Sequence, residues 1–283
     1  MTKLLYLECT SGISGDMCAA ALLDAGASEE AVRRALESLP VEGFAVEISR
    51  VKKSGLDVCD FSVVLDAAHE NHDHDMAYLH GHGGTSEHGH GHDHGHAHDH
   101  DHGHGAPGGH HHRGPAEIAQ IIDGAAMTDG AKAIAHRMFG FVADAEARAH
   151  GVPVGEVHFH EVGAVDSIAD IIAIAVAADD LAADGVVVSD LPCGYGTVRC
   201  QHGLIPVPAP ATAFIAEAAG LTLSPMDVEG ELVTPTGAAA AAALRTEAAL
   251  PERFSIKAIG MGAGKRAYDT PGILRAMIIE PAE

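Results

Sequence analysis

Tryptophan is absent from this chain, and aromatic residues make up only 4% of its 283 residues. The hydrophobic content of 47% still allows a sizeable core, which must be built mainly from Ala, Val, Ile and Leu. Basic residues are scarce as well: 17 Lys and Arg stand against 40 Asp and Glu, for a formal net charge of −23. Because nucleic acids and anionic membranes are bound by clustered basic side chains, this balance argues against both partners.

The sequence also lacks the marks of a secreted or membrane protein. No segment is long and apolar enough to cross a bilayer, and the short apolar run after Lys3 soon meets Glu8, unlike a signal peptide. The five cysteines include no C-x-x-C pair, and their number is odd. We therefore expect a cytoplasmic protein with reduced thiols. A homo-oligomer is compatible with the sequence, which does not specify one.

Strands and helices are predicted to alternate along most of the chain, which indicates an α/β or α+β fold. A loop-rich stretch is expected at 191–210 and a glycine-rich basic loop at 260–266. The predicted strands are 3–9, 44–53, 56–66, 186–189, 254–259 and 273–279, and the predicted helices are 16 to the stop at Gly26, 29–39, 116–123, 129–149, 166–184, 211–219 and 238–249.

Residues 67–114 interrupt this pattern, because they hold 17 of the 22 histidines and almost no apolar side chains. With so little surface to bury, the segment is expected to be disordered, an insertion in one body formed by 1–66 and 115–283. Its internal position and its interleaved Asp and Gly argue against a cloning tag. Neutral imidazoles bind nickel, copper, zinc and cobalt, so the segment predicts metal binding. The densest part contains His90, His92, His94, His96, His98, His100, His102 and His104.

A second concentration of possible metal ligands follows. His158 and His160 would share one face of an extended segment, and Asp166 and Asp170 would share one face of the helix that comes next. Together with Glu161 they make an imidazole and carboxylate set that suits a borderline divalent metal such as nickel or zinc. Each residue alone also has an ordinary structural interpretation, as a helix cap, a solvated carboxylate or a core histidine.

Two junctions between a strand and a helix are candidates for binding an anion, because the first N–H groups of a helix attract one. The first junction matches neither the dinucleotide fingerprint nor the P-loop, and an ordinary turn is an equal alternative. Its Asp16 would repel a bare phosphate and is instead a candidate metal ligand. The residues concerned are Ser11, Gly12, Ser14 and Gly15 in the first junction and Thr234, Thr236 and Gly237 in the second.

Four motifs occur in a fixed order, with the histidine-rich insertion before the second. They lie at 11–17, 158–166, 202–212 and 230–238. Together they closely resemble the LarC family of nickel-insertion proteins, over nearly the whole chain. The resemblance implies a CTP-dependent nickel chelatase, or cyclometallase, of the lyase class. Its substrate would be pyridinium-3,5-bisthiocarboxylic acid mononucleotide, and its product the nickel-pincer nucleotide of lactate racemase.

On this interpretation the histidine-rich insertion gathers nickel, and the two junctions hold the phosphate or ribose of the nucleotide. Forming the nickel–carbon bond releases the C4 proton of the pyridinium ring. Glu161, His158 and His160 are the candidates for accepting that proton, on the basis of their chemistry.

The sequence departs from the family in two ways. Glu8 stands where the family usually has Asp. Family members also continue into a C-terminal domain that carries the CTP and divalent-metal site (Mn or Mg) and drives oligomerisation, whereas this sequence ends at Glu283. We therefore expect an N-terminal portion that needs this domain as a partner, and a lactate racemase-type apoenzyme as recipient of the cofactor.

Two other functions are open at this point. A nickel store or metallochaperone would act through the histidine-rich insertion alone. A phosphate-binding hydrolase would rest only on the glycine-rich loops, and the sequence offers it no recognisable nucleophile and base.

Overall fold

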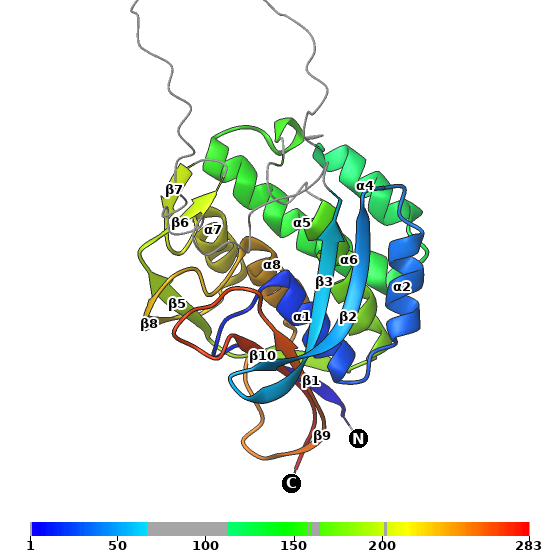
Figure 1. Ribbon diagram of the computed structural model, residues 1–283, viewed down its shortest axis with the longest axis vertical. Helices are drawn as coiled ribbons and strands as arrows, with labels where there is room; N and C mark the ends of the chain where they lie inside the picture. Colours follow the sequence, from blue (N-terminus) through cyan, green and yellow to red (C-terminus); the bar gives the residue numbers. More distant parts are fainter. Residues whose placement is uncertain (1, 67–112, 158, 160–164, 201–202, 283) are drawn as a thin grey trace, which may run out of the picture.

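The computed structural model describes residues 2–66, 113–157, 159, 165–200 and 203–282. Within those residues, seven α-helices and ten strands form a mixed α and β structure (Figure 1). The predictions for residues 67–112 and for His158, His160 and Glu161 lie outside the described residues.

A six-stranded sheet forms one layer, in the order β2-β3-β9-β10-β1-β4. It contains both antiparallel pairs, such as β1 with β10, and parallel pairs, such as β1 with β4. The sheet is therefore mixed, although strands and helices largely alternate along the chain. Its strands are β1 (Leu4–Glu8), β2 (Phe44–Lys53), β3 (Leu56–Leu65), β4 (Gly185–Val188), β9 (Phe254–Ala263) and β10 (Ile273–Pro281).

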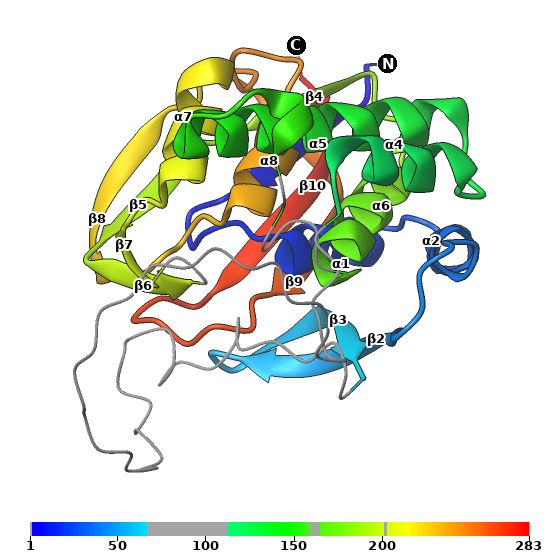
Figure 2. The ribbon, with the colours of Figure 1, turned by 90° about the horizontal axis from the view of Figure 1, so that it is seen from above.

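Helices cover one face of this sheet in two layers (Figure 2). Helices α1, α6 and α8 lie in the inner layer, and α5 packs across α6 and α8 on their outer side. The helices are α1 (Gly15–Asp24), α2 (Glu29–Glu37), α4 (Pro115–Gly124), α5 (Asp129–His150), α6 (Val165–Asp180), α7 (Pro210–Ala219) and α8 (Pro235–Leu244), with a short 3-10 helix at Val154–Glu156.

Small residues let the inner helices come close to their neighbours. A side chain at Gly262 would place its Cβ 2.0 Å from the Met17 carbonyl oxygen of α1, so α1 lies directly on β9. Helix α6 is apolar on nearly all sides, with Ile171, Ile172 and Ile174 fully buried, because α1, α2 and α5 surround it. This packing fixes the N-terminal ends of α1, α6 and α8 relative to one another.

The prediction of a loop-rich stretch at 191–210 was wrong. This region contains β5 (Leu191–Tyr195), β6 (Thr197–Cys200) and β7 (Gly203–Pro206). Strand β5 pairs in parallel with β8 (Leu223–Glu229), and β6 pairs antiparallel with β7. Proline and glycine hide these strands in the sequence, but pairing partners distant in the chain override the local composition.

Three boundaries also differ from the predictions. Helix α6 ends at Asp180 rather than at residue 184, because the backbone turns left-handed at Ala182 (φ 46°). Helix α8 covers Pro235–Leu244 instead of 238–249, since Thr234 caps it. Gly260–Ala263, predicted as part of a basic loop, belongs to β9. The other predicted elements are confirmed to within two residues. Among the described residues, no helix combines the length and the apolarity needed to cross a membrane.

Candidate functional site

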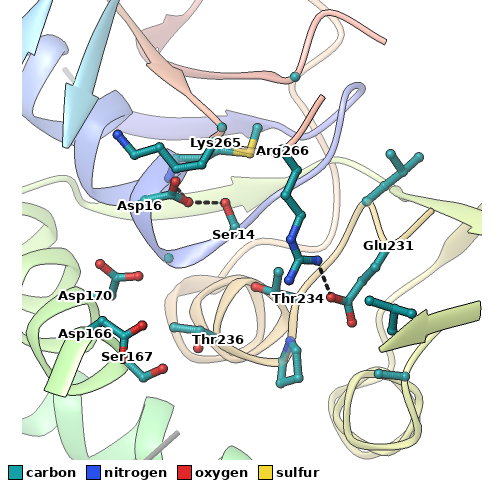
Figure 3. A pocket seen from close by; sticks show the side chains of 18 of the residues that line it. Ser14, Asp16, Asp166, Ser167, Asp170, Glu231, Thr234, Thr236, Lys265 and Arg266 are labelled. Atoms are coloured by element: carbon teal, nitrogen blue, oxygen red, sulfur yellow. Dashed lines mark hydrogen bonds and ion pairs between the residues drawn. The ribbon is translucent and has the colours of Figure 1, made fainter. Parts of the chain in front are cut away.

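A cavity of about 150 Å³ lies where the N-termini of α1, α6 and α8 meet the connection between β9 and β10 (Figure 3). Converging helix N-termini create a region of positive potential, which suits anionic ligands. The walls are nevertheless rich in charges of both signs. Lining residues include Ser11, Ser14, Gly15, Asp16, Asp166, Ser167, Asp170, Glu231, Thr234, Thr236, Lys265, Arg266 and Tyr268.

The two predicted junctions are joined backbone to backbone beside this cavity. Ile13 N–H donates to the Leu232 carbonyl (3.0 Å), and Thr234 N–H donates to the Ile13 carbonyl (3.2 Å). A Cβ at Gly237 would lie 2.1 Å from the Ile13 oxygen, and one at Gly12 (φ 113°) would lie 2.3 Å from the Leu232 oxygen. These two glycines therefore permit the close approach, while other residues of the junctions line the cavity.

Three carboxylates, Asp16, Asp166 and Asp170, gather on one side of the cavity, and we name them the acidic corner (Figure 3). One oxygen of Asp16 accepts hydrogen bonds from the Ser14 hydroxyl and from the Met17 N–H (2.8 Å). Its other oxygen is buried and has no hydrogen-bond partner among the described residues. Only the lack of a side chain at Gly15 leaves room for Asp170, since a Cβ there would lie 2.1 Å from Asp170 Oδ2.

The charges of the acidic corner lie close enough to repel one another. Burial raises the pKa of Asp170 well above its ordinary value, and the nearby charges of Asp16 and Asp166 raise it further, while Lys265 acts in the opposite direction. Such an arrangement favours either a bound proton or an added cation. The acidic corner is therefore the part of the cavity that suits a metal ion or another positive group.

Two cations that line the cavity already have partners, and we name the part of the lining that they form the paired wall. Lys265 forms an ion pair with Asp60 of β3, and Arg266 forms one with Glu231. Glu231 is only 6% exposed, so the Arg266 guanidinium is what allows its charge to be buried. In Figure 3 the Arg266 side chain reaches down to the Glu231 carboxylate beside Thr234.

Two further side chains hold the paired wall in place. The Tyr268 ring lies against Gly230, where a Cβ would be 2.2 Å from the ring, and burial raises the pKa of its hydroxyl. The Lys53 ammonium of β2 donates to the carbonyls of Gly264 (2.6 Å) and Arg266 (3.0 Å), and burial lowers its pKa. No local sequence signal predicts the Lys53 contacts, because they join segments more than 200 residues apart.

The structure brings the carboxylates predicted as metal ligands, Asp16, Asp166 and Asp170, to one cavity together with most of the two junctions. It does not test the roles of His158, His160 and Glu161 or of the histidines from His90 to His104, which lie outside the described residues. Within the part of the chain that is described, no three His, Cys, Asp or Glu side chains are grouped so as to hold a metal ion on their own. The metal ligands therefore stay a prediction.

Comparison with known proteins supplies the family. A family model described as nickel insertion protein matches residues 5–283. The pyridinium-3,5-bisthiocarboxylic acid mononucleotide nickel insertion protein of Alkaliphilus metalliredigens is 48% identical over 282 residues, 99% of this chain and 61% of the relative. The protein of the same name from Geobacillus kaustophilus is 38% identical over 280 residues, 98% of this chain and 60% of the relative.

A putative nickel insertion protein of a Geobacter species (strain M21) is 38% identical over 283 residues, 99% of this chain and 62% of the relative. The chain thus spans about three fifths of the length of these relatives. No solved structure matches it. The match of the family model along nearly the whole chain shows that this protein belongs to the LarC-type nickel insertion protein family.

Proposed function

We propose that this chain takes part in inserting nickel into pyridinium-3,5-bisthiocarboxylic acid mononucleotide, the substrate in the names of its relatives. The observation that carries the proposal is the cavity with an acidic corner and a paired wall. The substrate is negative at its phosphate, and its two thiocarboxylates outweigh the one positive charge of the pyridinium ring. The acidic corner would therefore receive the nickel and not the ring.

The reaction replaces one proton by nickel. Nickel(II) binds the two thiocarboxylate sulfurs and forms a bond to C4 of the ring, and the C4 proton leaves to a base. We propose Glu161, His158 or His160 as this base, as their chemistry suggests. Asp16, Asp166 and Asp170 would stabilise the metal during transfer, and they would hold it loosely because they lack a complete ligand set.

The nucleotide would lie along the two joined junctions. Ser11, Gly12, Ser14 and Gly15 form one side, and Thr234, Thr236 and Gly237 form the other. In this arrangement the N–H groups of α1 and α8 point toward the ligand, as is usual for nucleotide sites at helix N-termini.

The histidine-rich insertion would collect nickel for this cavity. Its described flanks support this role: Phe61 and Val63 of β3, shortly before the insertion, line the cavity. At the other flank, the Arg113 carbonyl accepts a hydrogen bond from the N–H of Phe159 (3.5 Å), the residue between His158 and His160 in the sequence. Both ends of the insertion are therefore attached close to the residues that would use the metal.

CTP, with Mn or Mg, would act through the part of the relatives that this chain does not span, and a lactate racemase-type enzyme would receive the product. The direct test incubates the chain with the nickel-free mononucleotide, nickel and CTP, with and without the remaining part of the Alkaliphilus relative. Mass spectrometry should detect the nickel adduct. Asp170→Asn should lower its formation, whereas Asp144→Asn, at an exposed position on α5, should not. No adduct under any of these conditions would rule out the proposal.

A nickel store is the second candidate, because 17 of 22 histidines lie in the insertion. A variant without residues 67–114 separates the two functions. If the protein is a nickel store, this variant would lose all nickel binding in equilibrium dialysis and all biological effect. An insertion protein would still form the adduct when nickel is supplied in excess.

A further inference from the structure

Lys265 is the cation of the paired wall whose charge reaches the acidic corner (Figure 3). Its ammonium forms an ion pair with Asp60 of β3. The side chains of Lys265 and Asp60 are only 19% and 15% exposed, so solvent screens their charges weakly. The same ammonium acts on Asp170, because it opposes the rise in the pKa of that carboxyl. Lys265 therefore belongs electrostatically to both parts of the cavity.

The backbone on both sides of Lys265 is held in place. The Lys53 ammonium donates to the carbonyls of Gly264 (2.6 Å) and Arg266 (3.0 Å). These are the residues directly before and after Lys265 in the chain. With its backbone fixed, Lys265 keeps mainly the freedom of its long side chain, and the ion pair with Asp60 determines where the ammonium lies.

The acidic corner contains an atom that needs a positive partner. One oxygen of the Asp16 carboxylate is buried and has no hydrogen-bond partner among the described residues. A buried carboxylate oxygen in this state is unfavourable unless a cation or a donor completes it. Lys265 does not complete it, because within the described part of the chain its ion pair is with Asp60 and not with Asp16 or Asp170. The corner is thus left open to an added cation, although a lysine is near.

We propose that Lys265 limits how tightly the acidic corner holds a divalent cation, and that Asp60 is a positioning residue that keeps Lys265 from filling the corner itself. Without Asp60, the ammonium turns to the carboxylates of the corner and takes the place of the metal ion. With Asp60, the negative charge of the corner is reduced but not cancelled, so a metal ion binds there and leaves again. The proposal rests on the proposed function for the identity of this ion, which is nickel on its way to the nucleotide.

The test is titration of the full chain with manganese(II), followed by electron paramagnetic resonance of the free ion. Manganese prefers carboxylate oxygens to imidazoles, so the histidine-rich insertion contributes little. Asp170→Asn should remove the share of binding that belongs to the acidic corner, and the variants are compared in this share. Lys265→Met should raise its affinity about tenfold, and Asp60→Asn, which releases the ammonium, should lower it about tenfold, the size of one charge–charge contact near solvent.

A double variant separates positioning from a distant effect of charge. In a chain that already carries Lys265→Met, Asp60→Asn should change the affinity less than about twofold, because no ammonium is left to release. A distant effect of the Asp60 charge would have the same size in both chains. The matched control is Lys257→Met, which removes the cation from the ion pair between Lys257 and Glu280 and should leave the affinity unchanged.

Three results would overturn the proposal: equal binding by the unmodified chain and by Asp170→Asn, unchanged affinity in Lys265→Met, and an equal effect of Asp60→Asn with and without Lys265. Circular dichroism checks that each variant is folded. If Lys265→Met is not folded, Lys265→Gln takes its place, since an amide can still donate a hydrogen bond to Asp60. The titration contains no nucleotide, so failed nickel insertion with these affinities as expected would count against the proposed function only.

Discussion

The two sides of the cavity treat charge in opposite ways. Lys265 and Arg266 of the paired wall each have a carboxylate partner, and the more deeply buried partner, Glu231, is held by Arg266. In the acidic corner, like charges gather, and the pKa of Asp170 rises as a result of burial and of its neighbours. The paired wall is complete as it stands, whereas the acidic corner becomes favourable only when a cation or a proton is added.

This difference indicates which part of the cavity binds the part of the ligand that changes during a reaction. A neutral, rigid wall recognises a group that stays the same, such as a phosphate. A corner with excess negative charge is electrostatically unfavourable until an incoming metal ion compensates it, and proteins keep such arrangements where function requires them.

The largest effect is expected when the paired wall is broken. Arg266→Met leaves the Glu231 carboxylate buried without its partner, which should lower the free energy of unfolding by about 3 kcal/mol. Adding Glu231→Gln in the same chain removes the uncompensated charge and should recover most of this loss. Urea denaturation of the single and the double variant measures both values. A double variant as unstable as the single one would show that the pairing is not what stabilises this wall.

A side chain at Gly237 should separate the two junctions. Gly237→Ala forces a Cβ to within 2.1 Å of the Ile13 oxygen, so the backbones of α1 and α8 must move apart, at a cost of about 2 kcal/mol. Gly140→Ala is the matched control in the middle of α5, where a Cβ meets nothing within 4 Å. There the substitution should stabilise by up to about 1 kcal/mol, since Ala favours helix. Equal shifts in the melting temperatures of the two variants would contradict the close contact between Gly237 and Ile13.

Much of this site could be read from the sequence, because its parts lie next to strong local signals. Asp16 and Asp166 each stand at the beginning of an expected helix, Thr234 belongs to an expected strand–helix junction, and the structure brings all three to one cavity. The glycines of the junctions were recognised as turns, although their actual role is to let two backbones touch.

The rest depends on contacts that no local pattern encodes. Lys53 reaches the paired wall from a strand more than 200 residues away, and Glu231 gains its role only through Arg266. The strands β5 to β8 were missed for the same reason, since their pairing is between segments rather than within them. Local propensity finds most of the helices, and it finds long-range strand pairs poorly.

The acidic corner should respond to pH in the opposite sense to an ordinary salt-bridged carboxylate. The folded state holds the Asp170 proton to a higher pH than the unfolded chain does, because its pKa is raised. Between the unfolded and the folded pKa the folded state binds more protons, so the free energy of unfolding falls as pH rises through this interval. Asp170→Asn removes this loss and should raise the free energy of unfolding at pH 8 by about 1.5 kcal/mol, a common size for one stabilising change.

Thermal unfolding of the Asp170→Asn variant and of Asp144→Asn at pH 5 and pH 8 tests this dependence. The gain from Asp170→Asn should be smaller at pH 5, and the exposed control on α5 should show little change at either pH. A gain that does not depend on pH would mean that charge in the acidic corner is not its cause.

The smallest effect concerns the cap of α8 on the side of the paired wall. Thr234→Ala removes the oxygen that accepts the Gly237 N–H and should cost about 1 kcal/mol, whereas Thr234→Ser keeps the oxygen and should cost only a few tenths. Urea denaturation of both variants measures this difference, because only Thr234→Ala removes the oxygen that caps the helix. An equal cost for Thr234→Ala and Thr234→Ser would mean that the hydroxyl oxygen does not stabilise the start of α8.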